Sequence, residues 1–326
     1  MPKYIPPSED LEDLDYDFNS KGPRGRMPEA HHVPKKKQSQ VLEEIVEATG
    51  LEGGFNTTYQ PAQYEKVWLL SSLRVFYDEH LISDVLAMVK GGKEASVYRC
   101  QAVSHTGLDL VAAKVYRPQM FRNLRNDKMY REGRQILTGE GRIVKRTDHR
   151  IMRAIGKKTA FGEQVQHSSW LLYEYTTLLK LHQAGAAVPQ PHAVGDNAII
   201  MDYIGDSRRS APTLNEIKLD GRQARQLFQE VLRNIELMMQ QGFVHGDLSA
   251  YNMLYWDERL TLIDFPQVTD IRTNRNARFI LQRDIMRVCE YFSRQGVRCN
   301  ADAITEDLWQ RYGSSEEEGE LLEELA

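Results

Sequence analysis

The stretch from His245 to Pro266 constrains this chain more than any other part of its sequence. It begins His245-Gly246-Asp247-Leu248-Ser249-Ala250-Tyr251-Asn252, and the later run Leu262-Ile263-Asp264-Phe265-Pro266 places a second aspartate after apolar residues. This layout suits phosphoryl transfer, because one carboxylate can receive a hydroxyl proton while an amide oxygen and the other carboxylate hold a divalent metal on nucleotide phosphates. On local composition alone, the alternative is a turn rich in Asp and Asn between a helix and a hairpin.

The composition is that of an ordinary soluble globular protein. The 326 residues carry a formal charge of -4 and are 41% hydrophobic, which allows one large domain or two lobes around a shared cleft. No run approaches the roughly 18 apolar residues of a membrane span, and the Pro-containing, acidic N-terminus lacks the apolar core of a secretory signal. The three cysteines form no CxxC pair, so we expect a cytoplasmic protein with no membrane partner and no cysteine metal site.

Both ends of the chain are expected to be tails. The segment 1–55 mixes Pro, Gly, acids and a Lys35–Lys37 run, with a short helix predicted at 40–49, and the C-terminal end carries acids from Glu316 to Glu324. From Pro61 to about 84, apolar residues recur at spacings of three and four, which predicts one or two helices laid on a later sheet. A DNA-reading helix-turn-helix is the alternative there, but the segment is not basic.

A β-rich block follows. Strands are predicted at 85–90 and 96–102, around the turn Gly91-Gly92-Lys93-Glu94, and at 110–116, where Lys114 stands near the end of an apolar run. The N–H groups of such a turn can face phosphate oxygens, and a lysine can reach them as a point charge. By themselves these features are more often those of an ordinary hairpin with an edge lysine.

The segment from Lys114 to Lys158 is strongly basic. It contains 14 Lys or Arg against four Asp or Glu, an excess of +10, so the rest of the chain carries -14. Arg122, Arg125 and Lys128 stand at helical spacing, which would align them on one face. A solvated surface is the simplest interpretation, and binding of RNA or of an acidic protein is the alternative.

Glu174 stands in a helix predicted from Trp170 to about 183, capped by Ser168 or Ser169 and ended by Gly185. The glutamate lies on or beside the apolar face, where a carboxylate is costly unless it is paired, and Lys114 is the natural partner. A solvated helix glutamate is the alternative. The rest of the prediction consists of an extended connector at 188–191, a strand at 198–205 and a helix with an apolar stripe from 227 to 238. A strand at 260–263 and two further helices, at 283–292 and 303–312, follow.

Together these residues resemble the RIO family of atypical protein kinases and ATPases. The matching pieces are Gly92-Lys93-Glu94-Ala95-Ser96-Val97-Tyr98, Lys114, Glu174 before Val188-Pro189, the His245–Asn252 motif and Ile263-Asp264-Phe265-Pro266-Gln267. The match covers roughly residues 60–295, and its short motifs are specific only in combination.

The resemblance implies an α+β, two-lobed protein-kinase-like fold with a trimmed C-terminal lobe, and ATP and Mg²⁺ in the cleft. The implied domains are a flexible tail at 1–55, an N-terminal lobe at 56–204 with extra helices and a basic insertion at about 117–168, a reduced C-terminal lobe at 205–312 and an acidic tail at 313–326. The segment after Asp264 is short for a protein kinase, so we expect no extended peptide platform. The acceptor would be another protein or the chain itself, and the basic segment would be a contact for RNA or a ribosomal particle.

Site roles follow from the same match, residue by residue. Lys114 would hold the phosphates and pair with Glu174, Asp247 would be the catalytic base, and Asn252 and Asp264 would bind metal. Gly91, Gly92, Lys93 and Ser96 would cover the triphosphate, and Met201, Tyr203 and Ile204 would meet adenine at a hinge. The implied activity is that of a serine/threonine protein kinase, an autophosphorylating enzyme or an ATPase that passes through a phosphorylated Asp264.

The chain also departs from the family pattern. Family members often carry Ser-Thr before Gly-Lys-Glu, where this chain has Lys90-Gly91, and Ala250 replaces a frequent glutamate. The chain looks more like a prokaryotic member. Two other functions are compatible with parts of the pattern. A small-molecule phosphotransferase of the aminoglycoside or choline kinase kind shares His-Gly-Asp and Ile-Asp, and a nucleotide-gated RNA-binding factor would use the basic segment.

Overall fold

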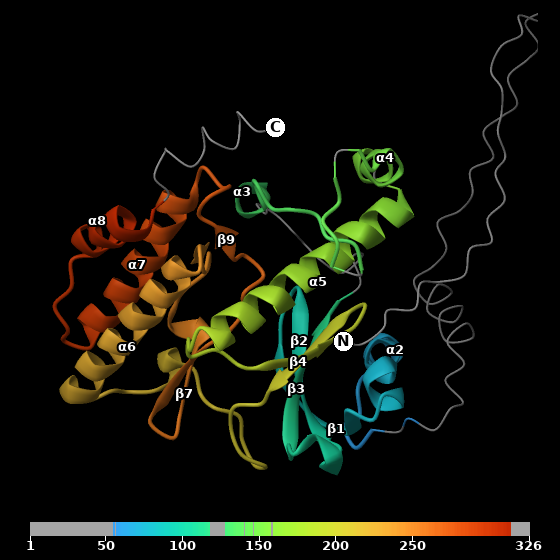
Figure 1. Ribbon diagram of the computed structural model, residues 1–326. Coiled ribbons are helices and arrows are strands. Elements are labelled where there is room, and N and C mark those ends of the chain that lie inside the picture. The colour runs from blue at the N-terminus through green and yellow to red at the C-terminus, as the bar shows by residue number, and fades with distance from the viewer. Residues whose placement is uncertain are drawn as a thin grey trace, which may run out of the picture. The chain divides into compact units, whose positions relative to one another are not determined.

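The computed structural model describes residue 55 and residues 57–117, 128–139, 141–145, 147–157 and 159–313 (Figure 1). All the elements below belong to one compact unit, residues 53–326. The helix predicted at 40–49, the Lys35–Lys37 run, the acids after Gly313, and Arg122 and Arg125 lie outside the described residues, as does the side chain of Lys128.

A five-stranded antiparallel sheet forms the first layer. Its order is β1 (Ile82–Gly91), β2 (Ala95–Ala102), β3 (Leu110–Tyr116), β5 (Ala198–Asp202) and β4 (Pro191–Val194). The apolar run of β3 makes it the central strand, because a strand buried on both faces needs no alternation of polar residues. Lys114 is paired with Val97 on β2 and with Ile199 on β5, so its position is fixed from both sides.

Two helices pack against this sheet. Helix α2 (Gln63–Asp78) contacts β1 and β3, and the long helix α5 (Ala160–Gln183) contacts β4 and β5. The predicted start of α5 was wrong: Thr159, not Ser168 or Ser169, is its N-cap, and the Thr159 side chain accepts the N–H of Gly162. Ser169 lies inside α5, and its hydroxyl oxygen instead accepts the N–H of Leu137 at 2.9 Å. This serine therefore binds the segment that precedes α4 and does not cap the helix.

Between β3 and α5, the described residues include two short helices, α3 (Lys128–Arg131) and α4 (His149–Gly156). Helix α4 packs against α5. A turn of 3-10 helix, η1 (Ser104–Thr106), links β2 to β3.

The second half of the unit is mainly helical. Figure 1 shows α6, α7 and α8 gathered beside one another. These helices are α6 (Gly221–Gln240), α7 (Ala277–Arg294) and α8 (Ala301–Tyr312). Two small strand pairs accompany them: β6 (Phe243–Val244) with β9 (Thr269–Asp270), and β7 (Met253–Trp256) with β8 (Arg259–Leu262). The 3-10 turns of this half are η3 (Leu214–Glu216) and η4 (Ala250–Asn252). One cluster of buried side chains runs from Tyr116 of the sheet through Leu178 of α5 to Phe292 of α7, so the two halves share a core around the cleft.

The α+β, two-lobed prediction is confirmed, with local corrections. The region from Pro61 to residue 84 forms one helix and the start of β1, and β1 begins at Ile82 rather than residue 85. Strand β4 was not predicted, because Pro191 made its sequence look like a connector. Helix α7 begins at Ala277, earlier than the predicted 283. None of the helices in the described part of the chain is long and apolar enough to cross a membrane.

Candidate active site

Lys114 lies between two carboxylates at the centre of the site. Its Nζ is 2.6 Å from Oε1 of Glu174 on α5 and 2.6 Å from Oδ1 of Asp264. The lysine and the glutamate are buried, with 9% and 2% of their side chains exposed, whereas 44% of the Asp264 side chain is exposed. The Tyr116 hydroxyl donates a hydrogen bond to the other oxygen of Glu174. The predicted pairing of Lys114 with Glu174 is confirmed.

The charges of Lys114 and Asp264 stabilise each other. Burial by itself would lower the pKa of Lys114, but the carboxylates of Asp264 and Glu174 raise that pKa well above its ordinary value. Burial raises the pKa of Asp264, and the Lys114 ammonium outweighs it, so the pKa of Asp264 lies below its ordinary value. A fixed cation next to a partly exposed carboxylate suits the binding of phosphate and metal.

Asp264 has an unusual backbone conformation. Its φ angle is 72°, in the left-handed region that residues other than glycine rarely adopt and that tends to occur at functional sites. The loop that follows is fixed through the carbonyl oxygen of Pro266, which accepts hydrogen bonds from Trp170 Nε1 and from the Arg134 guanidinium, both at 3.1 Å. The carboxylate is therefore held in place by α5 and by the segment after α3.

The predicted catalytic loop, His245–Asn252, contacts buried side chains beneath it. Gly246 has φ 87°, and a Cβ there would collide with the carbonyl oxygen of Gln267, so only glycine fits. Its N–H donates to Oδ2 of Asp284 on α7 at 2.7 Å, and Arg283 donates to its carbonyl oxygen. His245 is buried and lies 3.2 Å from the carbonyl oxygen of Ile263, and burial lowers the pKa of His245 to about 4. The imidazole is thus neutral.

The Asp247 side chain is more exposed to solvent than His245 and Asp284, which are buried. Oδ1 of Asp247 pairs with Arg287 of α7 at 2.6 Å, and 40% and 39% of the two side chains are exposed. The amide nitrogen of Asn252 donates to the Asp247 carbonyl oxygen at 2.9 Å and reaches its Oδ2 at 3.3 Å. These two contacts fix the orientation of the Asn252 amide group.

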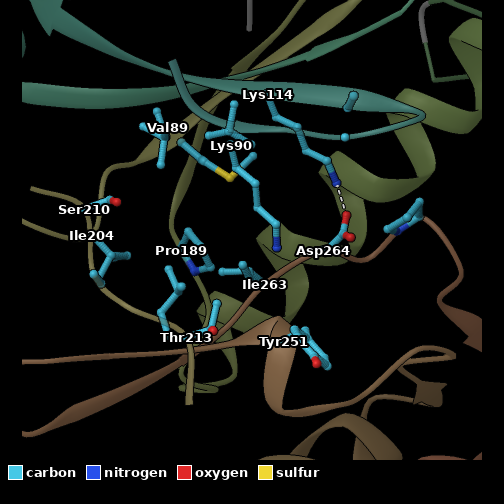
Figure 2. A pocket seen from close by; sticks show the side chains of 18 of the residues that line it. Val89, Lys90, Lys114, Pro189, Ile204, Ser210, Thr213, Tyr251, Ile263 and Asp264 are labelled. Carbon is cyan, nitrogen blue, oxygen red and sulfur yellow. Dashed lines mark hydrogen bonds and ion pairs between the residues drawn. The ribbon is translucent and has the colours of Figure 1, made fainter. Parts of the chain in front are cut away.

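A cavity of about 630 Å³ joins these groups to the sheet. Figure 2 shows Lys114 and Asp264 linked on one side of it and Ile204 and Thr213 on another. The predicted site residues that line the cavity are Gly92, Lys93, Lys114, Glu174, Met201, Tyr203, Ile204, Asp247 and Asp264. At the glycine turn, Gly92 N–H donates to the Ala95 carbonyl oxygen at 2.9 Å, and a Cβ on Gly92 would lie 2.6 Å from that oxygen. A tight turn at this position therefore requires glycine.

The remaining predicted residues do not line the cavity. Ser96 is buried within the sheet with 1% of its surface exposed, Gly91 ends β1, and Asn252 is buried at the end of η4. Trp170, Asp284 and Arg287 are among the residues that contact these loops and were not predicted. The first was seen only as a helix start, and the other two fall in a helix whose periodicity predicts nothing about contacts with a loop much earlier in the sequence.

The oxygen donors fit a divalent cation that is shared with a nucleotide. Among the described residues, no three His, Cys, Asp or Glu side chains cluster as a complete metal site. Mg²⁺ is commonly held by one or two protein oxygens together with substrate phosphates and waters. Asp264 and Asn252 provide that kind of partial set.

Comparison with known proteins agrees with this geometry. Residues 96–304 match the family described as RIO domain. A RIO-type serine/threonine-protein kinase Rio1 from Haloferax volcanii is 31% identical over 219 residues, which are 67% of this chain and 66% of that protein. A serine/threonine-protein kinase RIO1 from Chaetomium thermophilum is 28% identical over 236 residues, 69% of this chain and 42% of that protein.

A shorter relative gives the same result. The RIO-type serine/threonine-protein kinase Rio1 of Thermoplasma acidophilum is 33% identical over 137 residues, 42% of this chain and 70% of that protein. The chain thus spans just under two thirds of the Haloferax protein and less than half of the Chaetomium protein. The RIO-domain match extends over more than half of the 326 residues and includes the His245–Asn252 motif and Asp264. The chain belongs to the RIO-domain family.

Proposed function

We propose that this chain is an ATP-dependent phosphotransferase of RIO type, acting as a serine/threonine protein kinase on another protein or on itself, or as an ATPase. One observation carries the proposal. Lys114 is held between Glu174 and Asp264 at 2.6 Å from each, inside a cavity that also contains Asp247. Phosphoryl transfer needs positioned charge more than covalent chemistry, and this cavity supplies both signs of charge at fixed places. Family membership favours this function over that of a small-molecule phosphotransferase.

Each side chain has a proposed role. Lys114 binds phosphate oxygens, and Glu174 holds the lysine in position. Asp247 orients the acceptor and receives its proton. Asp264 and Asn252 hold a divalent cation, for which we propose Mg²⁺ on the strength of the oxygen-only donor set. When bound, this cation neutralises charge on the transferred phosphoryl group.

The nucleotide base is proposed to lie against the end of β5. Met201, Tyr203 and Ile204 line the cavity there, and a strand end can offer backbone N–H and C=O groups to a flat heterocycle. Glycines 91 and 92, with Lys93 and Ser96, would close over the triphosphate from the β1–β2 turn.

The test is transfer from radiolabelled ATP with Mg²⁺ by the full chain and by Asp247→Asn and Asp264→Asn. We expect labelled protein or released phosphate from the wild type, and a fall of at least about 100-fold in each variant, because each loses a charge that the transition state needs. Asp109→Asn is the matched control, since Asp109 is exposed in the turn before β3 and does not line the cavity. Equal turnover in all four proteins would refute the assigned roles.

The chemistry of the label separates the acceptors. A phosphate ester on serine or threonine survives acid, whereas an acyl phosphate on Asp264 is released by hydroxylamine. Label that resists hydroxylamine supports the kinase activity. Label that hydroxylamine removes, and that Asp264→Asn abolishes, supports an ATPase that passes through a phosphorylated aspartate.

We also propose RNA, free or in a ribosomal particle, as a partner of the basic segment. Arg150, Arg153 and Lys157 are exposed on and just after α4, a spacing that places cations along one helix. If these residues contact phosphates, the affinity for a single-stranded RNA should fall steeply as salt is raised. An affinity that does not change with salt would exclude the contact.

A further inference from the structure

Lys90, at the end of β1, enters the cavity in an unusual way. Successive side chains of a strand normally point to opposite faces, yet Val89 and Lys90 both line the cavity. The pairing of β1 with β2 is irregular at this point: Met88 is opposite Tyr98, and Lys90 is already opposite Val97. Such a bulge turns a side chain away from the regular alternation and is common beside active sites. The local backbone therefore directs this lysine into the cavity.

The ammonium of Lys90 makes no hydrogen bond or ion pair with any described residue. Figure 2 shows its side chain extended into the cavity, ending on the side of Ile263, the neighbour of Asp264. Lys114, by contrast, already has two carboxylates at 2.6 Å, which leaves one of its three N–H donors for a ligand. Of these two lysines, the protein itself engages Lys114 and leaves Lys90 to face the cavity.

Lys90 interacts electrostatically with two carboxylates across the cleft. The carboxylate of Asp264 interacts electrostatically with Lys90 as well as with Lys114. The pKa of Glu216 is lowered chiefly by hydrogen bonds from Thr213, and Lys90 adds to this effect. Both carboxylates belong to the segments opposite the sheet, so the lysine faces the space between the two halves of the cleft.

We propose that Lys90 is a further phosphate-binding cation of the nucleotide site, beside Lys114 and Lys93, and that it increases the preference of the site for a nucleoside triphosphate over the bare nucleoside. The inference rests on the proposed function and adds to it a residue that stands where family members often carry serine. An exposed ammonium gains from a phosphate a charge-assisted hydrogen bond that adenosine cannot provide. The contribution should weaken with salt, because exposed charges are screened.

The test compares binding of ATP with Mg²⁺ and of adenosine, by titration calorimetry, to the full chain and to three variants. Lys90→Met keeps the approximate length of the side chain and removes its charge, and Lys90→Arg keeps the charge. Lys66→Met is the matched control, because it makes the same change in net charge on an exposed residue of α2 that does not line the cavity. Thermal melting of each variant checks the fold, which this exposed residue should not affect.

We expect Lys90→Met to raise the Kd for ATP about tenfold and to leave the Kd for adenosine unchanged, with Lys90→Arg and Lys66→Met close to the wild type. Raising the salt concentration should narrow the difference between wild type and Lys90→Met. Equal loss of ATP and adenosine binding would overturn the inference, since Lys90 would then shape the base pocket. Unchanged ATP binding in Lys90→Met would overturn it while leaving the proposed function intact. A wild type that binds no ATP would overturn both.

Discussion

The two sides of the cleft hold their charges in opposite ways. On the side proposed to bind phosphate, Lys114 and Glu174 are almost completely buried, and each is surrounded by fixed partners from β3 and α5. On the side proposed to receive the acceptor, Asp247 and Arg287 form an ion pair at the same distance of 2.6 Å, but 40% and 39% of their side chains are exposed to solvent. Equal distances therefore describe unequal interactions, because water screens the second pair and hardly reaches the first.

The difference in burial between the two ion pairs suggests that the two sides of the cleft have different roles. Under the proposed function, the nucleotide side would bind the same ligand in every cycle, so its charges could be fixed in a dry setting where they act strongly. The acceptor side would have to admit a hydroxyl group or water, and an exposed ion pair can be exchanged at little cost. This comparison predicts large, coupled effects of mutation on the phosphate side and smaller, separable effects on the acceptor side.

The largest effect should come from Lys114→Met. Two carboxylates would lose their common cation, and breaking a buried pair from one side typically costs about 3–5 kcal/mol of folding free energy. Phosphate binding is lost as well, so we expect turnover to fall by at least about 1,000-fold, more than for the loss of one hydrogen-bond donor. Urea unfolding and labelled-ATP turnover measure the two losses.

The double variant Lys114→Met, Glu174→Gln makes the interpretation specific. Removing the unpaired carboxylate should restore a large part of the stability but none of the activity, since neighbouring mutations are not additive. If the two stability losses simply add, Lys114 and Glu174 are not coupled, and the contrast between the two sides fails.

The next largest effect concerns Asp284, which lies beneath the catalytic loop. Burial raises the pKa of Asp284 to about 7, against the lowering effect of Arg283. The folded protein therefore keeps a proton that the unfolded chain has lost, so this group's contribution to stability is full below pH 4 and is lost as the pH rises through 7. A shift of about three units corresponds to on the order of 4 kcal/mol.

Asp284→Asn should remove this slope while still accepting the N–H of Gly246. The measurement is the free energy of unfolding in urea from pH 4 to 8 for wild type, Asp284→Asn and the exposed control Asp109→Asn. Parallel curves for wild type and Asp284→Asn would show that Asp284 titrates alike in the folded and unfolded chain, and that the acceptor side has no buried support of this kind.

His245 should give the opposite dependence on pH. Burial lowers the pKa of His245 to about 4, below the ordinary 6.5. Its contribution is full above pH 6.5 and is lost as the pH falls through 4, by on the order of 3 kcal/mol. His245→Asn should therefore flatten the loss of stability between pH 6.5 and 4, measured in the same urea series. An equal acid loss in wild type and variant would mean that His245 takes up its proton at the same pH in the folded and the unfolded chain.

Much of this site was predictable from sequence because phosphoryl transfer needs particular groups at fixed local spacings. Asp247, Asn252 and Asp264 stand close together in the sequence, and Lys114 and Glu174 stand out as charges in apolar elements, which need partners. The family assignment and the two-lobed fold followed from these motifs. The order of the strands and their bulges did not, because register depends on pairing between distant segments.

The supporting residues escaped prediction for a physical reason. Trp170, Asp284 and Arg287 act through contacts with loops that are distant in the sequence, and helical periodicity carries no information about such partners. The start of α5 was misplaced for a related reason: Ser169 has the composition of a cap, but its hydroxyl is used by Leu137. Local patterns thus located the reacting groups, and tertiary contacts decided what holds them.

The smallest effect is predicted for Arg287→Met, and it bears most directly on the comparison. Asp247 would keep its contacts with Asn252, and an exposed ion pair contributes about 0.2–1 kcal/mol, so stability should change by less than about 1 kcal/mol. Orientation of the carboxylate would be looser, which we expect to lower kcat about tenfold without changing KM for ATP. Arg287→Lys should retain most of the activity, and Arg294→Met, on the exposed end of the same helix, serves as the control. An Arg287→Met variant as inactive and as unstable as Lys114→Met would mean that the acceptor-side pair is as rigid as the buried one, and exposure would then not explain how the two sides differ.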